Sequence, residues 1–358
     1  MYICSENWEK PLYQPGIERW SAYKTLWIRH WKEFQNISPY RFEKIYGSLT
    51  EEKKDQVQKL IRCGKFQNGF QRHPCPECGI VLVVPSTCKS RLCLSCARKR
   101  LFGWSLNLSK IMSDTLTHTH VTFTMPGTIA RLLFKLNYEP EQMMPMTAKI
   151  YKNYLVSSAG LKGKEYQPGI LVTLHKSGNR LNYNPHVHLI GTREIIDTKT
   201  GEIIEMTFIP YKNIRFIWKK AFLNHLLTQG TFTEEKYQKF NDIYKNGFHV
   251  YFQHITGNLN DVLFRTAEYI ASEYFYNRQI VEVNHHIKTV AFRYKKRMDR
   301  GTRKKHYAIE TISIYAFMAR MLFFLPDKHR KMLRYYGIYA HNIRRKLDQI
   351  EKTPGQRY

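Results

Sequence analysis

The chain has few acidic residues for its size. Of its 358 residues, 29 are Asp or Glu against 57 Lys or Arg, so the formal net charge is +28 at pH 7. Such an excess indicates a polyanionic partner, because each phosphate contact made by a basic side chain releases a condensed counterion. The basic residues are spread along the chain with tyrosine and phenylalanine between them, rather than gathered in one amphipathic segment. This distribution favours nucleic acid over a membrane surface.

Long hydrophobic runs are also lacking, as are two motifs. The most apolar stretch, YAFMARMLFFLP, is too short and too interrupted to span a bilayer. The N-terminal residues MYICSENWEKPLYQPG have no basic start followed by an apolar core, so we see no secretory signal and expect a cytoplasmic protein. No G-x-x-x-x-G-K-[ST] motif occurs, which excludes a recognisable P-loop motor in this chain.

Cysteine is present but unevenly placed, with six of the seven in residues 63–96. In a cytosolic chain such clustering indicates a metal site rather than disulfides. The motif C-x-x-C occurs twice with fourteen residues between, close to the spacing of a zinc ribbon, and four thiolates leave no open coordination position. We therefore predict a structural Zn²⁺ ion bound by Cys75, Cys78, Cys93 and Cys96. Cys63 and Cys88 are either buried thiols or substitutes for one of these ligands.

Basic residues lie among and after these cysteines. They predict a DNA-binding surface on the zinc unit, and the alternative is an ordinary solvated face. The residues concerned are Lys89, Arg91, Arg98, Lys99 and Arg100.

Two histidines flank one valine in the strand-like run PHVHLIG, residues 185–191. Alternate side chains of a strand share a face, so His186 and His188 point the same way. A loop of about ten residues would bring the preceding strand alongside and place His175 next to them. Three converging imidazoles leave open positions on a metal, as Lewis-acid catalysis requires, whereas a lone histidine would more simply be a hydrogen-bonded or surface residue.

Three tyrosines lie on the helix candidate NDVLFRTAEYIASEYFYN, residues 260–277: Tyr269, Tyr274 and Tyr276. A tyrosine can attack a phosphodiester and leave a phosphotyrosine at the 5′ side, which conserves the bond energy for rejoining. Because the chain contains 24 tyrosines, some of these three must serve core packing.

The hydrophobic period changes along the chain and predicts four regions. Residues 1–62 have helical periodicity, 63–112 form the zinc-binding unit, and 301–358 form a basic, largely helical C-terminal region. Between them, 113–300 alternate as strands, with a helical insertion at about 205–247 and a basic hairpin that turns at DRG, residues 299–301.

Several blocks, in this order, resemble one known family. The stretch LIRCGKFQNGFQRHPCPECG…STCKSRLCLSCARKR is similar to its zinc-binding domain, including the positions of Cys63 and Cys88. HVTFTMP, LVTLHKSGNRLNYNPHVHLIG and HRKMLRYYGIYAHNIRRK are similar to its first catalytic strand, its histidine block and its C-terminal signature. The chain thus resembles the HUH (histidine–hydrophobe–histidine) two-tyrosine rolling-circle transposases of bacterial insertion sequences, the group typified by insertion sequence ninety-one.

The tyrosines depart from that family's pattern, in which two tyrosines four residues apart share a helix face. Here Tyr269 and Tyr274 are five apart, and Tyr269 and Tyr276 seven apart. The choice of nucleophile, and whether one or two tyrosines act, stays open at this point.

The resemblance implies an α+β fold with an HUH endonuclease core, in which helices pack on a central antiparallel sheet. It implies a DNA transposase that cleaves and transfers single-stranded DNA, either extended or folded as a hairpin, from the ends of a transposon to a target DNA. His175, His186 and His188 would hold Mg²⁺ or Mn²⁺, and the enzyme would act at the nucleoid of a prokaryotic cell. C-terminal cations would neutralise the strand: Arg334, Arg344 and Arg345. The alternatives are a plasmid replication initiator or relaxase, and a non-catalytic zinc-ribbon DNA-binding regulator.

Overall fold

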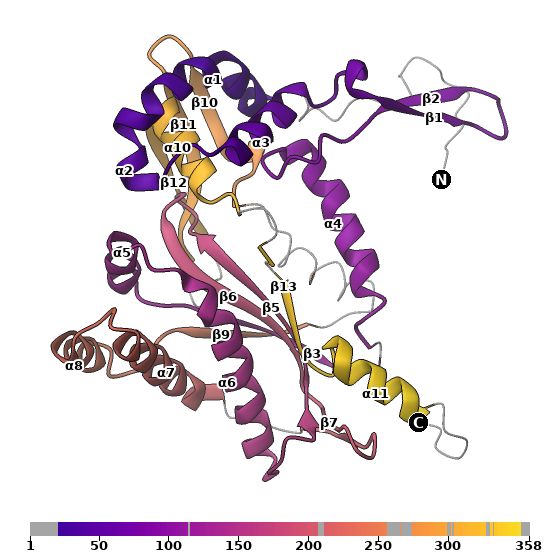
Figure 1. Cartoon of the computed structure of the whole chain (residues 1–358), viewed down its shortest axis with the longest axis vertical. Helices are drawn as coiled ribbons and strands as arrows, with labels where there is room; N and C mark the ends of the chain where they lie inside the picture. Colours follow the sequence, from indigo (N-terminus) through magenta and orange to yellow (C-terminus); the bar gives the residue numbers. More distant parts are fainter. Residues whose placement is uncertain are drawn as a thin grey trace. The chain divides into compact units, whose positions relative to one another are not determined.

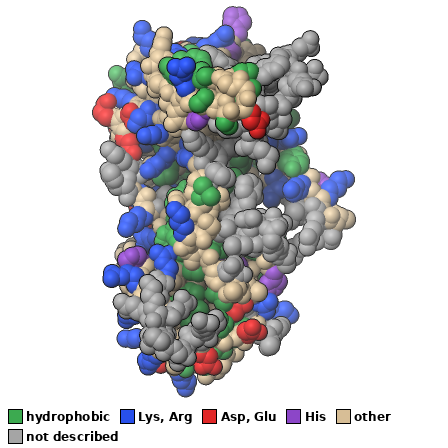
Figure 2. All heavy atoms as spheres, turned by 90° about the vertical axis from the view of Figure 1, so that its right-hand side faces the viewer, with side chains coloured by type: hydrophobic (Ala, Val, Ile, Leu, Met, Phe, Trp, Pro, Cys, Tyr) green, Lys and Arg blue, Asp and Glu red, His purple; other side chains and the backbone are tan. Residues whose placement is uncertain are grey.

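The computed structural model describes residues 21–113, 115–206, 211–255, 266, 274–298, 302, 304–326, 330–331 and 333–351. Helices and sheets are mixed in these residues, as expected of the α+β class (Figure 1). None of the described helices is both long and apolar enough to cross a membrane. Lys and Arg side chains are spread widely over the face shown in Figure 2, where acidic side chains are fewer.

The chain forms two compact units, and each unit is assembled from separate stretches of sequence. The first consists of residues 1–100, 179–182 and 273–329, and the second of 101–178, 183–272 and 330–358. This division differs from the predicted boundaries. The sequence pattern identified consecutive blocks, whereas the basic hairpin and the helix after it return to pack with the N-terminal helices.

The first unit is built on a three-stranded antiparallel sheet in the order β10–β11–β12. One face of this sheet contacts the helices α1 and α10. Aromatic rings fill that contact. The ring centroid of Phe275 lies 5.0 Å from that of Phe317 and 5.8 Å from that of Phe292. The elements of this unit are α1 (Ala22–Arg41), α2 (Glu43–Tyr46), α3 (Glu51–Arg62), η2 (Phe66–Asn68), β1 (Phe70–Pro74), β2 (Val81–Pro85), η5 (Asn277–Gln279), β10 (Ile280–Asn284), β11 (Thr289–Met298), β12 (Lys305–Ser313) and α10 (Ile314–Phe323).

Local sequence explains the helix starts in this unit. Ser21 and Thr50 precede α1 and α3, and their side chains accept hydrogen bonds from the main-chain N–H three residues on. Such caps satisfy N–H groups that have no partner within the helix. Helix α4 (Leu94–Leu108) begins in the first unit and ends in the second.

The second unit is built on a five-stranded antiparallel sheet in the order β13–β5–β6–β3–β9. Small strands β4, β7 and β8 form a separate sheet. The elements of this unit are β3 (His118–Phe123), α5 (Gly127–Lys135), η3 (Pro140–Gln142), α6 (Met143–Ser158), β4 (Tyr166–Gln167), β5 (Gly169–Ser177), β6 (Tyr183–Thr192), β7 (Ile195–Asp197), β8 (Ile203–Ile204), η4 (Tyr211–Asn213), α7 (Ile214–Thr228), α8 (Glu234–Ile243), β9 (Val250–Ile255), β13 (Leu333–Gly337) and α11 (His341–Glu351). Helices α7 and α8 lie within the helical insertion predicted at about 205–247.

The two faces of the five-stranded sheet differ in chemistry. One face carries Val121, Val172 and Leu189, which join the main hydrophobic core together with residues of α5, α6 and α7. The other face carries a smaller apolar cluster that includes Leu171 and Ile190. Further along the same face of β5 and β6 the apolar side chains give way to histidine, which is where the candidate site lies.

Candidate metal centres

Three histidines converge on one face of the β5–β6 pair. His175 and His186 lie directly opposite each other in the antiparallel register, and His188 lies opposite Thr173. The ring centroid of His188 is 4.6 Å from that of His175 and 4.9 Å from that of His186. One nitrogen of each of the three rings lies within 4.8 Å of the others. The structure therefore brings together all three histidines that the sequence singled out.

Hydrogen bonds orient two of these rings. Nδ1 of His186 lies 2.8 Å from the carbonyl oxygen of Asn184, so this nitrogen donates and Nε2 keeps its lone pair. Nδ1 of His188 lies 2.8 Å from Nε2 of His120 on the neighbouring strand β3. If Nδ1 of His188 donates to His120, the lone pair of His188 is likewise on Nε2. Both rings then present Nε2 as a metal ligand.

Burial keeps the site neutral. Removal from water lowers the pKa of His186, and it lowers the pKa of His188, with the neighbouring imidazoles adding to the effect. For His120, burial lowers the pKa to about 4. Neutral imidazole is the form that binds metal, so these rings need lose no proton when an ion arrives.

His120 is a functional candidate that the sequence pattern did not reveal. Its side chain is 3% exposed, and its Nε2 is also 3.3 Å from the hydroxyl of Thr122. A hydrogen-bond partner behind a metal-binding histidine fixes the tautomer and the direction of the ring. The available signal was THTHVTFT, in which His118 and His120 alternate in a strand, but the register between β3 and β6 was needed to pair His120 with His188.

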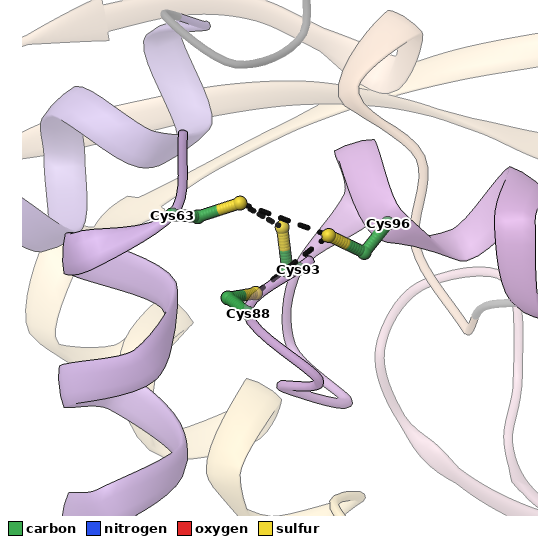
Figure 3. Close-up of side chains that lie close together, drawn as sticks. All are labelled: Cys63, Cys88, Cys93 and Cys96. Atoms are coloured by element: carbon green, nitrogen blue, oxygen red, sulfur yellow. Dashed lines mark hydrogen bonds between the residues drawn. The ribbon is translucent and has the colours of Figure 1, made fainter. Parts of the chain in front are cut away.

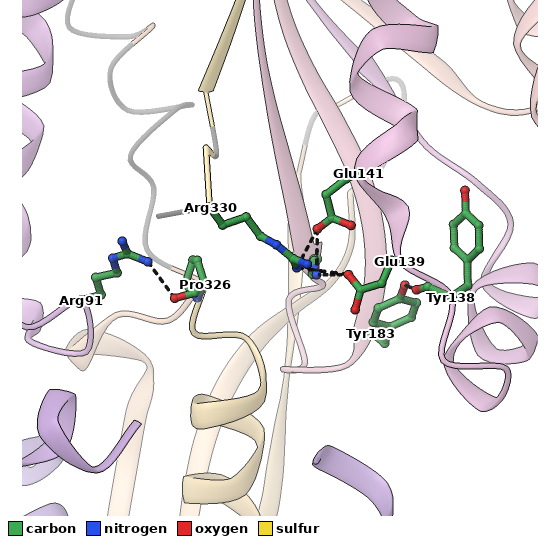
Figure 4. A network of polar contacts seen from close by, with 8 residues as sticks. Arg91, Tyr138, Glu139, Glu141, Tyr183, Pro326 and Arg330 are labelled. Carbon is green, nitrogen blue, oxygen red and sulfur yellow. Dashed lines mark hydrogen bonds and ion pairs between the residues drawn. The ribbon is translucent and has the colours of Figure 1, made fainter. Parts of the chain in front are cut away.

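An ion-pair network secures the chain next to the triad. Lys176 follows His175, and its ammonium lies 3.1 Å from a carboxylate oxygen of Glu139 and 3.1 Å from one of Glu141. The guanidinium of Arg330 reaches the same two carboxylates, at 3.1 and 2.9 Å (Figure 4). These contacts tie the end of β5 to the turn η3 and to the segment that leads into β13.

Four cysteines form a second cluster, in the first unit (Figure 3). Sγ of Cys63 lies 3.5 Å from that of Cys93 and 3.7 Å from that of Cys96, and Sγ of Cys88 lies 3.7 Å from that of Cys96. A tetrahedron with Zn–S bonds of about 2.3 Å has edges of about 3.8 Å, whereas a disulfide requires about 2.05 Å. The spacing fits four ligands of one zinc ion and does not fit disulfides.

Cys63, Cys93 and Cys96 are buried and Cys88 is half-buried. Hydrogen bonds among the four thiols lower the pKa of Cys63 to about 7 and hold the pKa of Cys96 well below its usual range, whereas they raise the pKa of Cys88 and of Cys93. The ammonium of Lys24 on α1 is buried and donates to the carbonyl of Cys63 at 2.5 Å. With all four positions taken by sulfur, an ion here is structural.

The membership of this cluster corrects the predicted ligand set. Cys93 and Cys96 belong to it, but Cys75 and Cys78 give way to Cys63 and Cys88. The turn at Cys75 does form, since Gly79 donates to its carbonyl at 3.0 Å, but this turn closes the far end of the β1–β2 hairpin.

Hairpin length explains this outcome. The strands β1 and β2 pair over five residues, from Phe70 opposite Pro85 to Pro74 opposite Val81. Five residues of strand span about 16 Å. Cys63 and Cys88 flank the open base of this hairpin, so they, rather than the cysteines at its turn, can reach Cys93 and Cys96.

The predicted DNA-binding cations near the cysteines have different environments. Arg100 donates to the carbonyl of Ser90 at 2.7 Å, and Arg91 donates to the carbonyl of Pro326 at 2.7 Å (Figure 4), so both hold the fold of this unit. Lys89 is exposed. Arg98 and Lys99 are on α4, with side chains outside the described part of the structure.

The C-terminal cations are likewise not equivalent. Arg334 lies opposite Val172 in the β13–β5 register, so it is on the sheet face away from the histidines. Arg344 and Arg345 are on α11, where Arg345 is exposed and Arg344 half-buried.

The tyrosine segment is described only in part. Tyr269 lies outside the described residues. Tyr274 and Tyr276 are not helical, which corrects the prediction that one helix runs through both, and they belong to the first unit, whereas the histidines belong to the second. The hydroxyl of Tyr274 donates to the carbonyl of Met321 at 2.8 Å, and Tyr276 is 40% exposed with the guanidinium of Arg278 5.0 Å from its ring.

Comparisons with known proteins match the regions that contain these two clusters. Residues 169–346 match a family described as "Putative transposase", and residues 28–125 match the "Transposase zinc-binding domain". The first match contains the histidine triad, and the second contains all four clustered cysteines.

Two relatives extend the match over most of the chain. The chain is 25% identical over 353 residues to the "Transposase for insertion sequence element IS801" of Pseudomonas savastanoi pv. phaseolicola, covering 93% of this chain and 81% of the relative. It is 24% identical over 339 residues to the "Putative transposase y4qJ" of Sinorhizobium fredii, covering 87% and 80%. No solved structure matches the chain significantly. The protein therefore belongs to the transposases of the insertion sequence ninety-one type, with a structural zinc site in its N-terminal zinc-binding domain.

Proposed function

We propose that this transposase cuts and rejoins single-stranded DNA through a phosphotyrosine at the 5′ side of the break, as an HUH endonuclease. A divalent ion, Mg²⁺ or Mn²⁺, would be held by His175, His186 and His188. The observation that carries the proposal is the convergence of three imidazoles, with nitrogens within 4.8 Å of one another, on one face of an antiparallel sheet. Its DNA would come from the ends of the element, and its target would be a second DNA.

The donor set fits a catalytic rather than a structural ion. Three nitrogen ligands leave positions that phosphate oxygens can fill, where a bound ion would polarise the scissile phosphate. Neutral imidazole suits Mn²⁺ better than Mg²⁺, which prefers oxygen ligands, so we expect tighter binding of Mn²⁺. The chain's own contribution is to orient the nitrogens, through Asn184 for His186 and through His120 for His188.

The covalent step balances without an added energy source. The phenol oxygen of a tyrosine bonds to phosphorus, the bond from phosphorus to the 3′ oxygen breaks, and that oxygen leaves as a hydroxyl after taking a proton. Attack of a 3′ hydroxyl on the phosphotyrosine reverses the step and joins the strand to its target. A reaction that needs no nucleotide hydrolysis agrees with the absence of a P-loop motif from the sequence.

The contacts of the described tyrosines bear on which one attacks. Tyr274 would have to break its hydrogen bond to the carbonyl of Met321 before its oxygen could reach phosphorus. Tyr276 is exposed and has a guanidinium beside its ring. These contacts favour Tyr276 over Tyr274, with Tyr269 as the further candidate.

The test is an adduct assay on a 3′-labelled single strand that carries the element's terminus, incubated with Mn²⁺, because the fragment joined to the tyrosine keeps the 3′ end. We expect a covalent protein–DNA adduct, and mass spectrometry of its peptides names the tyrosine. The double variant His186→Ala/His188→Ala should form no adduct, whereas His341→Ala, which changes an exposed histidine on α11, should form as much as the wild type. An adduct that survives replacement of all three tyrosines by phenylalanine would refute the mechanism.

A further inference from the structure

The sheet β10–β11–β12 has one covered face and one open face. Val290 and Phe292 are fully buried, on the side that contacts α1 and α10. Strand alternation then turns Arg293 and Lys295 to the opposite side, where both are exposed. We call this opposite side, formed mainly by β11 and β12, the open face.

Large apolar side chains lie beside these cations. Antiparallel pairing places Ile309 directly opposite Arg293, and Tyr307 directly opposite Lys295. Tyr307 is 53% exposed and Ile309 is 58% exposed. The guanidinium of Arg293 lies 5.0 Å from the centroid of the Tyr307 ring, so a flat cation and an aromatic ring already stand together.

The charge of the open face is positive among its described residues. Lys305 adds a third cation on β12, and Glu282 on β10 is the acid on this side. The acid of β12, Glu310, is on the covered side, where its carboxylate pairs with Arg180 at 2.9 Å and with Arg320 at 3.1 Å. Because those two guanidiniums neutralise Glu310, it does not offset the cations of the open face.

We infer that the open face of this sheet binds an unpaired stretch of DNA, with a base stacked on Tyr307 and phosphates at Arg293, Lys295 and Lys305. Stacking of bases on aromatic side chains next to cations is the general means of holding a single strand. A duplex would use the cations but not Tyr307 or Ile309, since its bases are already stacked on one another. An acidic peptide would not need a flat ring. The inference rests on the proposed function for the source of the strand, but not for its physical basis.

The experiment measures DNA binding by the full chain, without added Mg²⁺ or Mn²⁺, using fluorescence anisotropy of a labelled oligothymidylate and of a duplex of equal length. For Tyr307→Ala we expect single-strand affinity to fall by about ten-fold or more, and duplex affinity to change less than two-fold, about the limit of the measurement. Tyr307→Phe keeps the ring and should bind as the wild type does.

The salt dependence of DNA binding tests the contribution of the cations on the open face. Each phosphate contact on a single strand contributes about 0.7 to the slope of log affinity against log salt. The double variant Arg293→Ala/Lys295→Ala should therefore lower that slope by about 1.4. The matched controls are Tyr40→Ala and Lys32→Ala, which remove an exposed ring and an exposed cation from α1 in the same unit and should leave both affinity and slope unchanged.

Two results would overturn the inference. One is a Tyr307→Ala protein that binds the single strand as Tyr40→Ala does. The other is an equal loss for single strand and duplex, which would make the face a general phosphate-binding surface. Because no catalytic metal is added, failure here is separate from failure of the proposed cleavage. If the wild type forms no phosphotyrosine adduct yet its strand binding depends on Tyr307, the mechanism falls and this inference stands.

Discussion

The cysteine cluster gathers its ligands from three separate places in the chain, whereas the histidine triad takes all its ligands from one pair of strands. Cys63 ends α3, Cys88 lies in the loop after β2, and Cys93 and Cys96 lie at the start of α4. The histidines need only the β5–β6 register. Thus the zinc ion would hold elements together, while the sheet holds the histidines together before any ion binds.

This difference separates a metal that the fold needs from a metal that the fold only receives. Binding of Zn²⁺ by four thiolates contributes directly to folding, because the unfolded chain has no such site. The triad is backed by hydrophobic packing on the other face of its sheet and by the hydrogen bonds of Asn184 and His120. It should therefore stay assembled without its ion. The predictions below test this contrast.

Loss of a zinc ligand should have the largest effect. Structural zinc is worth about 10–16 kcal/mol in small zinc domains, so Cys63→Ser should lose zinc and unfold the surrounding part of the first unit. Cys75→Ser is the matched control, since Cys75 lies at the hairpin turn, and it should retain the zinc. Metal content per chain and protease sensitivity measure both effects. Loss of zinc from the Cys75 variant instead would restore the ligand set predicted from the C-x-x-C spacing.

Loss of triad ligands should abolish metal binding without unfolding. For His186→Ala/His188→Ala we expect Mn²⁺ affinity, measured by electron paramagnetic resonance, to fall by about 100-fold or more, because two of three ligands are gone. Zinc content should be unchanged, and the melting temperature should not fall, because the variant no longer desolvates two polar rings without a metal ion. A variant that loses its zinc as well would show that the two centres are not independent.

Replacing His120, the hydrogen-bond partner of His188, should lower Mn²⁺ affinity less than replacing the ligands does. His120→Phe keeps volume and removes the acceptor for Nδ1 of His188, so Mn²⁺ affinity should fall by about ten-fold or more. His120→Gln can still accept a hydrogen bond and should recover part of this loss. Equal affinity in the two variants would mean that His120 contributes packing rather than orientation.

The contrast between the centres also explains what the sequence could reveal. Strand alternation and a loop of stated length were enough to unite His175, His186 and His188, because adjacent antiparallel strands leave few choices of neighbour. The α+β class was implied by the family resemblance. Which cysteines can reach one another depends on where the β1–β2 hairpin closes, and the spacing of cysteines along the chain does not reveal this. That spacing favoured Cys75 and Cys78, although about 16 Å of hairpin separates them from the cluster.

The sequence also did not reveal which distant segments pack together in the first unit. β10 and α10 contact α1, and α10 contacts α2, although β10 and α10 follow the histidine-bearing strands in sequence. Periodicity carries no information about such a return. The sequence likewise did not identify His120 as the hydrogen-bond partner of His188, because only the β3–β6 register places the two side by side.

The smallest expected effect concerns His118, a histidine of the same sheet face that serves the fold and not the metal. Its Nε2 lies 2.6 Å from the hydroxyl of Tyr339, and burial lowers its pKa from 6.5 to about 4, with the Glu194 carboxylate opposing that shift. Between these values the unfolded chain binds a proton that the folded chain does not. The stability contributed by neutral His118 is therefore complete above pH 6.5 and declines as the pH falls towards 4.

One pKa unit corresponds to 1.36 kcal/mol, so from pH 6.5 to 5.5 this histidine should cost the wild type about 1 kcal/mol of unfolding free energy. His118→Gln does not titrate and should lose correspondingly less over that interval, measured by urea denaturation at the two pH values. The other buried histidines titrate in both proteins, so the difference between the two slopes isolates His118. If the slopes are equal, then His118 is not kept neutral by the fold, and the distinction between metal-binding and packing histidines on this face fails.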